Sequence, residues 1–287
     1  MAGLTFRPSS MSLLVVQGPS LPHSTISELS TLTGASAVVQ PRPDVVHLVD
    51  VQRHQGVAEY CQAHRLDYAF LGQPRKLSEF CLLTMDMDST LIAIECIDEI
   101  ADFAGVKPQV AAITEAAMRG ELDFPTALRQ RVALLSGLPE SVLQRVYDER
   151  LRLSPGAENL LAAARSAGLK TLLVSGGFTY FVRRLATQLG LDYTLANELE
   201  IRSGALTGQV LGNIVDAPAK AAKLVSVCQE LGCSTQQAVV LGDGANDLKM
   251  MALGGFSVAF RAKPVVQRQA TVALNYCGLD GVLNWLE

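Results

Sequence analysis

The chain has 287 residues, of which 49% are hydrophobic and 18% charged, and its formal net charge is −4. This composition is typical of a soluble globular protein and excludes a disordered chain, and the length allows one or two domains with their own cores. No cluster of Lys and Arg favours a nucleic-acid partner, and no apolar run reaches the ~18 residues of a membrane span.

The positions of cysteine and histidine limit which metal sites and which catalytic nucleophiles the chain can have. The six cysteines contain no CxxC pair and match no zinc-binding spacing, so we expect reduced thiols and a cytoplasmic protein. The first 16 residues hold one basic residue and a short apolar run, which does not fit a signal peptide. All four histidines precede residue 65. The rest of the chain must therefore work without a histidine nucleophile or histidine metal ligands.

The first 75 residues predict a small α+β domain. Apolar alternation and turn residues place its elements in the order βαββαβ, which is typical of a ferredoxin-like fold. Residues 72–75 follow as a linker. The predicted strands cover 12–17, 37–40, 45–51 and 68–71, and the predicted helices cover 24–33 and 57–64.

Residues 76–287 predict an α/β domain with a doubly wound, mostly parallel sheet. Three apolar runs, at 80–85, 171–175 and 238–242, have the character of strands that are buried on both faces. Helical patterns lie between them, at 157–167 and 219–231 for example, and 194–200 with 205–210 could form a hairpin. Ligands bind such sheets at the carboxyl ends of the strands. The stretch over about 96–151 has helical signals alone, which predicts a small helical cap inserted into this domain.

The first strand of this domain is followed by Asp86-Met87-Asp88-Ser89-Thr90. One carboxylate could attack phosphorus, and a second, two residues on, could act as general acid and base. Carboxylate oxygens also suit a hard cation such as Mg2+. The structural alternative is a helix N-cap at Asp88 or Ser89.

Three other segments offer complementary groups. The segment Gly242 to Asp247 adds the carboxylates of Asp243 and Asp247 and the amide of Asn246 after a second strand, although a glycine-rich turn would also explain it. Ser175 and Gly176, after a third strand, could cradle a phosphate or form a plain strand–turn–helix joint. Lys220 could offset the charge of phosphate and aspartate, or lie on a solvated helix face. Together they supply the parts of a phosphoryl-transfer site.

These four segments resemble the motifs of the haloacid dehalogenase-like phosphatases. The resemblance implies that Asp86 is the nucleophile and that Asp88 is the general acid and base. It implies that Mg2+ is held by Asp86, Asp243 and the backbone carbonyl of Asp88. Ser175, Gly176, Lys220 and Asn246 would contact the phosphoryl group, and Asp247 would lie just outside the metal ligands.

Further residues resemble the branch of that superfamily that hydrolyses O-phosphoserine in serine biosynthesis. Glu95 would meet the substrate ammonium and Arg131 its carboxylate, because a zwitterion needs one anion and one bidentate cation. Phe124 would close over the substrate or be part of the cap core. Another small phosphomonoester, such as phosphohomoserine, is the alternative substrate, and a binding protein that has lost activity is the alternative class.

The N-terminal part resembles the ACT-type regulatory modules. Its first loop, Gln17-Gly18-Pro19, lacks an obvious amino-acid-binding signature. Serine sensing and dimerisation are therefore both open, and a homodimer is possible.

Overall fold

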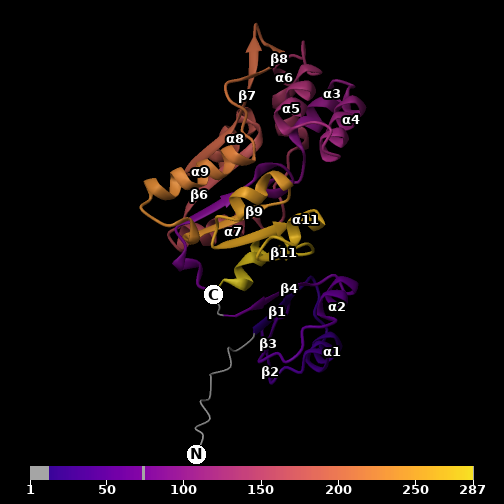
Figure 1. Cartoon of the computed structure of the whole chain (residues 1–287), viewed down its shortest axis with the longest axis vertical. Coiled ribbons are helices and arrows are strands. Elements are labelled where there is room, and N and C mark those ends of the chain that lie inside the picture. Colours follow the sequence, from indigo (N-terminus) through magenta and orange to yellow (C-terminus); the bar gives the residue numbers. More distant parts are fainter. Residues whose placement is uncertain (1–12, 73–74, 287) are drawn as a thin grey trace, which may run out of the picture.

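A computed structural model describes residues 13–72 and 75–286. Figure 1 shows a helical cap at the top, a large sheet in the middle and a small antiparallel sheet at the bottom. The predicted fold class, an α/β domain combined with a small α+β domain, is confirmed. The predicted residue 12 of the first strand and residues 73–74 of the linker lie outside the described residues.

The N-terminal sheet has the strand order β2-β3-β1-β4 and is antiparallel throughout. Side chains alternate along β1, so Leu14 and Val16 lie in the core beneath the two helices, whereas Val15 belongs to the core of the larger domain. The small sheet is therefore covered on both faces. Its elements are β1 (Leu13–Gln17), α1 (His23–Thr33), β2 (Ala37–Arg42), β3 (Val45–Val49), α2 (Val57–Ala63) and β4 (Asp67–Leu71).

The large sheet has seven strands in the order β11-β10-β9-β5-β6-β7-β8. All its pairs are parallel except the β7–β8 hairpin. In β5, Leu82 and Leu83 enter different cores on the two faces, which explains the unbroken apolar run. The strands are β5 (Leu82–Met85), β6 (Lys170–Phe178), β7 (Tyr193–Arg202), β8 (Ala205–Leu211), β9 (Ala238–Gly242), β10 (Phe256–Phe260) and β11 (Val272–Leu274).

Helices cover both faces of this sheet and form the cap. The segment predicted to be helical is helical, apart from an isolated bridge between Pro139 and Ala205. The cap consists of α3 (Cys96–Phe103), α4 (Lys107–Met118), α5 (Phe124–Ala133), α6 (Ser141–Arg145) and η3 (Val146–Arg150). The sheet carries η1 (Leu77–Glu79), η2 (Met87–Leu91), α7 (Ala157–Ser166), α8 (Thr179–Leu189), α9 (Ala217–Glu230), η4 (Thr235–Gln237), η5 (Ala245–Asp247), α10 (Leu248–Met251), α11 (Pro264–Gln267) and η6 (Leu279–Trp285).

Two expectations need correction. The strand β2 runs on through Pro41 and Arg42, whereas the predicted strand ended at residue 40, because an edge strand tolerates proline with its missing N–H. The expectation that all thiols are reduced is wrong for one pair, since Cys81 and Cys233 form a disulfide. Packing of the start of β5 against the loop after α9 brings together two cysteines that are 152 residues apart.

Among the described residues, no helix is both long enough and apolar enough to cross a membrane.

Candidate active site

The Asp86 carboxylate lies at the carboxyl end of the central strand β5 and is almost completely buried. Lys220, at the start of α9, donates to Asp86 Oδ1 at 2.6 Å and to Asp247 Oδ1 at 2.8 Å. Lys220 and Asp247 are fully buried. The exposed helix face that we considered for Lys220 is therefore wrong, because α9 begins at the same sheet edge as Asp86.

The buried charges in this cluster are not balanced. Burial and the charge of Asp247 raise the pKa of Asp86 well above its ordinary value, although Lys220 opposes this rise. Burial alone would lower the pKa of Lys220, but the charges of Asp247 and Asp86 outweigh it and the pKa rises. The pKa values of Asp86 and Lys220 both rise because carboxylates outnumber cations in this cluster. Lys220 therefore stays protonated, and the carboxylates favour a further cation.

Three carboxylates form a group that could hold a metal ion. Ligand oxygens of Asp86, Asp243 and Asp247 lie within 4.8 Å of one another. Burial and the charge of Asp247 raise the pKa of Asp243 to about 6, and Thr90 Oγ1 donates to Asp243 Oδ1 at 3.2 Å. An oxygen-only set fits a hard cation such as Mg2+. The structure brings Asp247 into this group, whereas the sequence placed it just outside.

The Asp88 carboxylate faces a different side of the site. Its Oδ1 accepts the backbone N–H of Cys96 at 2.8 Å, and its Oδ2 accepts the hydroxyl of Ser175 at 3.2 Å. Burial raises the pKa of Asp88. The chain leaves the helical conformation at Asp88 and turns left-handed at Ser89, with φ 55°. A carboxyl that is held beside Ser175, an expected phosphate-binding residue, and that favours its proton suits a general acid.

The last residues of β6 pass very close to their neighbours. A Cβ on Gly177 would overlap Asp88 Oδ2, and a Cβ on Gly176 would lie 2.8 Å from Cζ of Phe124. The Ser175 hydroxyl accepts the N–H of Gly177 at 2.8 Å. A side chain at Gly176 would therefore have to displace Phe124, and one at Gly177 would have to displace Asp88. This contact also brings Phe124, from the cap, onto the expected phosphate-binding residues.

Asn197, in β7, is a supporting residue that our sequence reasoning missed. Its Nδ2 donates to the carbonyl of Gly176 at 2.8 Å, and its Oδ1 accepts the N–H of Val215 at 2.8 Å. The side chain is 1% exposed. A buried amide with both ends bonded fixes the backbone around it. The available signal was an asparagine inside a strand, a position that this residue type seldom takes.

The cap places an acid and a guanidinium at the mouth of the site. Glu95 faces solvent and accepts the hydroxyl of Ser89 at 2.6 Å, and crowding by protein atoms, with the charge of Asp88, raises its pKa to about 8. Arg131 is half-buried, and its Nη1 donates to Thr114 at 3.4 Å. Among the described residues Arg131 forms no ion pair, so its charge is available. Asn246 lies beside Gly244 in the loop between Asp243 and Asp247.

Comparisons with known proteins agree with this geometry. The family described as haloacid dehalogenase-like hydrolase matches residues 83–252. A phosphoserine phosphatase of Polaromonas sp. is 56% identical over 213 residues, covering 72% of this chain and 90% of the relative. One from Haemophilus influenzae is 46% identical over 240 residues, covering 84% of this chain and 76% of the relative.

Solved structures extend the similarity to the fold. A probable phosphoserine phosphatase from Vibrio cholerae has a TM-score of 0.83 at 42% identity, covering 96% of this chain and 86% of that one. A substrate-bound phosphoserine phosphatase has a TM-score of 0.68 at 36% identity, covering 75% of this chain and all of that one. This chain therefore belongs to the haloacid dehalogenase-like hydrolases and, among them, to the phosphoserine phosphatases.

Proposed function

We propose that this protein hydrolyses O-phosphoserine to serine and phosphate through an aspartyl-phosphate on Asp86. The observation that carries the proposal is the arrangement around Asp86. A buried carboxylate at a strand end is bound by Lys220 and faces Asp243 and Asp247, and the carboxyl two residues on, Asp88, accepts the hydroxyl of Ser175.

The reaction proceeds in two displacements. An oxygen of Asp86 attacks phosphorus, the bond between phosphorus and the serine oxygen breaks, and Asp88 gives its proton to that oxygen. Water then attacks the phosphorus, Asp88 takes one of its protons, and the Asp86 carboxylate leaves. Lys220, Ser175, Gly176 and Asn246 hold the phosphoryl oxygens, where positioned donors stabilise the charge of the transition state.

Asp86, Asp243 and the backbone carbonyl of Asp88 would hold the Mg2+ ion, with Asp247 close enough to join them or to orient a bound water. The ion supplies positive charge that offsets the carboxylates and the phosphate. Lys220 alone cannot do this, because it already bonds two carboxylates. Chelation is expected to abolish turnover and added Mg2+ to restore it.

Selectivity for phosphoserine rests on the cap. Glu95 meets the ammonium, Arg131 binds the carboxylate, and Phe124 covers the phosphate-binding segment and excludes water. The alternative substrate, phosphohomoserine, differs by one methylene, which a pocket discriminates by only about 10- to 200-fold. The two must therefore be compared directly.

The mechanism is tested by Asp86→Asn. We expect kcat to fall by at least about 10³-fold, because an amide cannot form the acyl phosphate. Thermal unfolding serves as the control, since Lys220 keeps its bond to Asp247 in this variant. A folded variant that retains turnover would refute the mechanism.

The substrate is tested by kcat/KM for O-phosphoserine, phosphohomoserine, O-phosphoethanolamine, which lacks the carboxylate, and 3-(phosphonooxy)propanoate, which lacks the ammonium. We expect O-phosphoserine to lead by at least about 10²-fold over those two, because each leaves a charged cap residue unpaired. Equal values would remove the phosphoserine assignment.

Domain limits, location and assembly are further parts of the proposal. We place the domains at 1–75 and 76–287, with the cap at about 96–151. A cytoplasmic location is supported by four free thiols and opposed by the disulfide. Thiol titration of the purified protein would show whether Cys81 and Cys233 are reduced, as a cytoplasmic location predicts. A homodimer is supported by the edge strand β2, whose Val38 and Val39 are exposed, and sedimentation would test it.

A further inference from the structure

The segment after β10 reaches the same sheet edge as the proposed catalytic residues. Strands β9 and β10 are parallel neighbours, with Gly242 opposite Ala259. Because Asp243 follows β9, the residues Arg261, Ala262 and Lys263 leave β10 next to it. The Nζ of Lys263 lies 3.3 Å from Sδ of Met118, at the end of the cap helix α4. Lys263 therefore joins the sheet edge that carries Asp243 to the cap.

The Lys263 ammonium has a weak partner. A thioether accepts hydrogen bonds poorly, and Met118 is itself 63% exposed. Among the described residues Lys263 is exposed and forms no ion pair with a carboxylate. Its charge is thus not neutralised by the protein.

The same face of α4 carries the contact of Arg131. Thr114, which Arg131 contacts, precedes Met118 by four residues, so the two side chains lie one turn apart on one face. Lys263 and Arg131 therefore contact the same face of α4, one helical turn apart. Two cations placed so fit a substrate that has a dianionic phosphate and a carboxylate.

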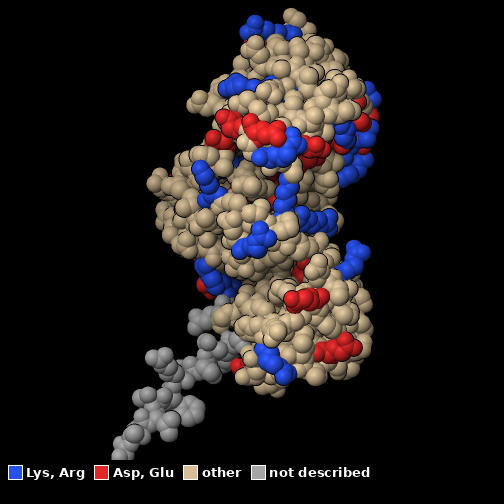
Figure 2. Space-filling model, turned by 45° about the vertical axis from the view of Figure 1, so that its right-hand side comes forward, with Lys and Arg blue, Asp and Glu red and all other residues tan. Residues whose placement is uncertain are grey.

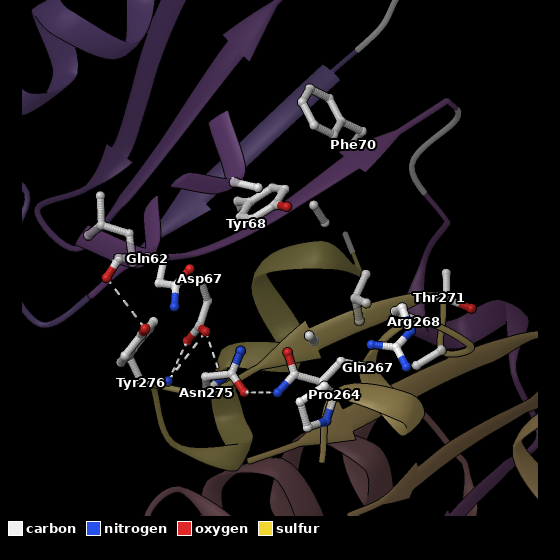
Figure 3. A pocket seen from close by; sticks show the side chains of 16 residues that line it. Gln62, Asp67, Tyr68, Phe70, Pro264, Gln267, Arg268, Thr271, Asn275 and Tyr276 are labelled. Atoms are coloured by element: carbon white, nitrogen blue, oxygen red, sulfur yellow. Dashed lines mark hydrogen bonds between the residues drawn. The ribbon is translucent and has the colours of Figure 1, made fainter. Parts of the chain in front are cut away.

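Hydrogen bonds tie the Lys263 segment to the N-terminal sheet. Gln267 Nε2 donates to the carbonyl of Ala262 at 2.6 Å and to Asn275 Oδ1 at 3.0 Å. The buried Asp67 carboxylate, at the start of β4, accepts the backbone N–H of Asn275 at 2.6 Å, of Tyr276 at 3.0 Å and of Cys277 at 2.8 Å. Figure 3 shows this chain of contacts from Asp67 through Asn275 to Gln267.

Packing does not fix α11 from the side of β4. A cavity of about 730 Å³ lies between them, and Tyr68 and Phe70 line it on one side and Pro264 and Arg268 on the other (Figure 3). On the other side, the buried Ala262 and Val266 pack the segment into a core cluster. The bonds of Gln267 and Asp67 therefore hold the side of the segment that faces the cavity.

We propose that Lys263 is a substrate-positioning residue at the mouth of the active site, and that Asp67 fixes the segment carrying it through Asn275 and Gln267. The proposal rests on the proposed function. Lys263 does not touch the reacting atoms, so it acts on substrate capture and on cap closure. The N-terminal domain thereby contributes to catalysis without supplying a residue to the site.

The test begins with Lys263→Met, measured with O-phosphoserine. We expect kcat/KM to fall about tenfold at low salt with kcat within about twofold, and the loss to shrink at high salt because screening weakens steering by charge. Lys263→Arg should retain most of the activity. The matched control is Lys76→Met, which removes an exposed lysine before the amino end of β5, at the opposite edge of the sheet.

The connection to the N-terminal domain is tested by Gln267→Leu and Asp67→Asn. Each should raise KM with little change in kcat, and neither should add its full effect to that of Lys263→Met, because all act through one side chain. Gln267 is only half-buried, so Gln267→Leu stays informative if Asp67→Asn unfolds. Fully additive effects would overturn the connection, and Lys263→Met behaving like Lys76→Met would overturn the role of Lys263.

These outcomes are separable from failure of the proposed function. Turnover of O-phosphoserine that vanishes in Asp86→Asn establishes that function first. If the wild type prefers another phosphomonoester, the same variants are measured with that substrate, since Lys263 is expected to attract its phosphate dianion as well.

Discussion

Asp86 and Asp88 stand two residues apart, yet their carboxyl groups have different neighbours. Asp86 bonds to the ammonium of Lys220, which opposes the rise in its pKa caused by burial and by the charge of Asp247. Among the described residues, Asp88 accepts bonds from a backbone N–H and a hydroxyl and forms no ion pair, which suits a proton carrier. The left-handed turn at Ser89 directs the chain away after the second carboxyl. Environment rather than residue type thus separates the proposed roles.

Glu95 leads to a prediction about pH. Its pKa of about 8 in the free enzyme means that it is protonated and neutral below that value and charged above it. Because only the carboxylate attracts the substrate ammonium, kcat/KM for O-phosphoserine should rise as the pH increases toward about 8. Glu95→Gln should lower kcat/KM by roughly 10- to 100-fold, as for loss of a charged bond, and flatten this rise. A wild-type rise that persists unchanged in the variant would contradict the prediction.

The close approach of Gly177 to Asp88 leads to a prediction about kcat. The added methyl group of Gly177→Ala must displace the Asp88 carboxyl, which two hydrogen bonds hold. A displacement of about 1 Å in a catalytic group costs on the order of 10²-fold in rate, so kcat should fall by about that factor. Gly72→Ala is the control, because nothing lies within 4 Å of the new Cβ there. Equal kcat in the two variants would show that a methyl group fits at Gly177 without displacing Asp88.

At the scale of elements, the parallel strand ends assemble the site. The strands β5, β6 and β9 are neighbours, so the residues that follow them meet at one edge of the sheet. Asn197 then links the end of β6 to β7 and to the segment before α9. These bonds tie Gly176, a proposed phosphate-binding residue, to the region that carries Lys220.

Replacing Asn197 should therefore reduce both stability and activity. Asn197→Ala leaves the Gly176 carbonyl and the Val215 N–H without partners, which should cost about 1–3 kcal/mol in the free energy of unfolding, measured in urea. Asn159→Ala is the matched control, because Asn159 is exposed and bonds only to Asp280, and its cost should stay within about 0.5 kcal/mol. Similar losses in both variants would remove the structural role of Asn197.

At the scale of the whole molecule, the two sheets share one buried cluster. Val15, Val45 and Ala69 of the small sheet belong to the same cluster as Trp285 near the C-terminus. Asp67 adds the hydrogen bonds described above. Acidic and basic side chains are interspersed on the face drawn in Figure 2, in line with the small net charge, so no single-sign patch marks a macromolecular partner there.

Removing residues 1–75 tests this arrangement. The shortened chain keeps every proposed catalytic residue, so we expect Mg2+-dependent turnover to survive with a raised KM. Loss of the shared cluster and of the Asp67 acceptor should lower Tm by about 5 °C or more, as for a few kcal/mol in a chain of this length. Differential scanning calorimetry measures the change. A shortened chain with unchanged Tm and KM would show that the two parts are independent.

The sequence by itself determined the order and type of the main elements. Apolar alternation and unbroken apolar runs are local patterns, and they predicted β5, β9, the βαββαβ order and the helical cap within a few residues. The motif residues at the strand ends were equally accessible, because parallel strands necessarily bring their carboxyl ends to one edge.

Only the tertiary structure decided which of these residues touch. Lys220 and Asp86 are 134 residues apart, and whether the lysine faces solvent or the nucleophile depends on how α9 packs. The same holds for Asp247 among the carboxylates that could hold a metal ion, for the bond of Asn197 to Gly176, for the Cys81–Cys233 disulfide and for the bonds of Asp67 to residues 275–277. Such contacts join segments with no shared periodicity, and they arise from the packing of whole elements, which local pattern does not encode.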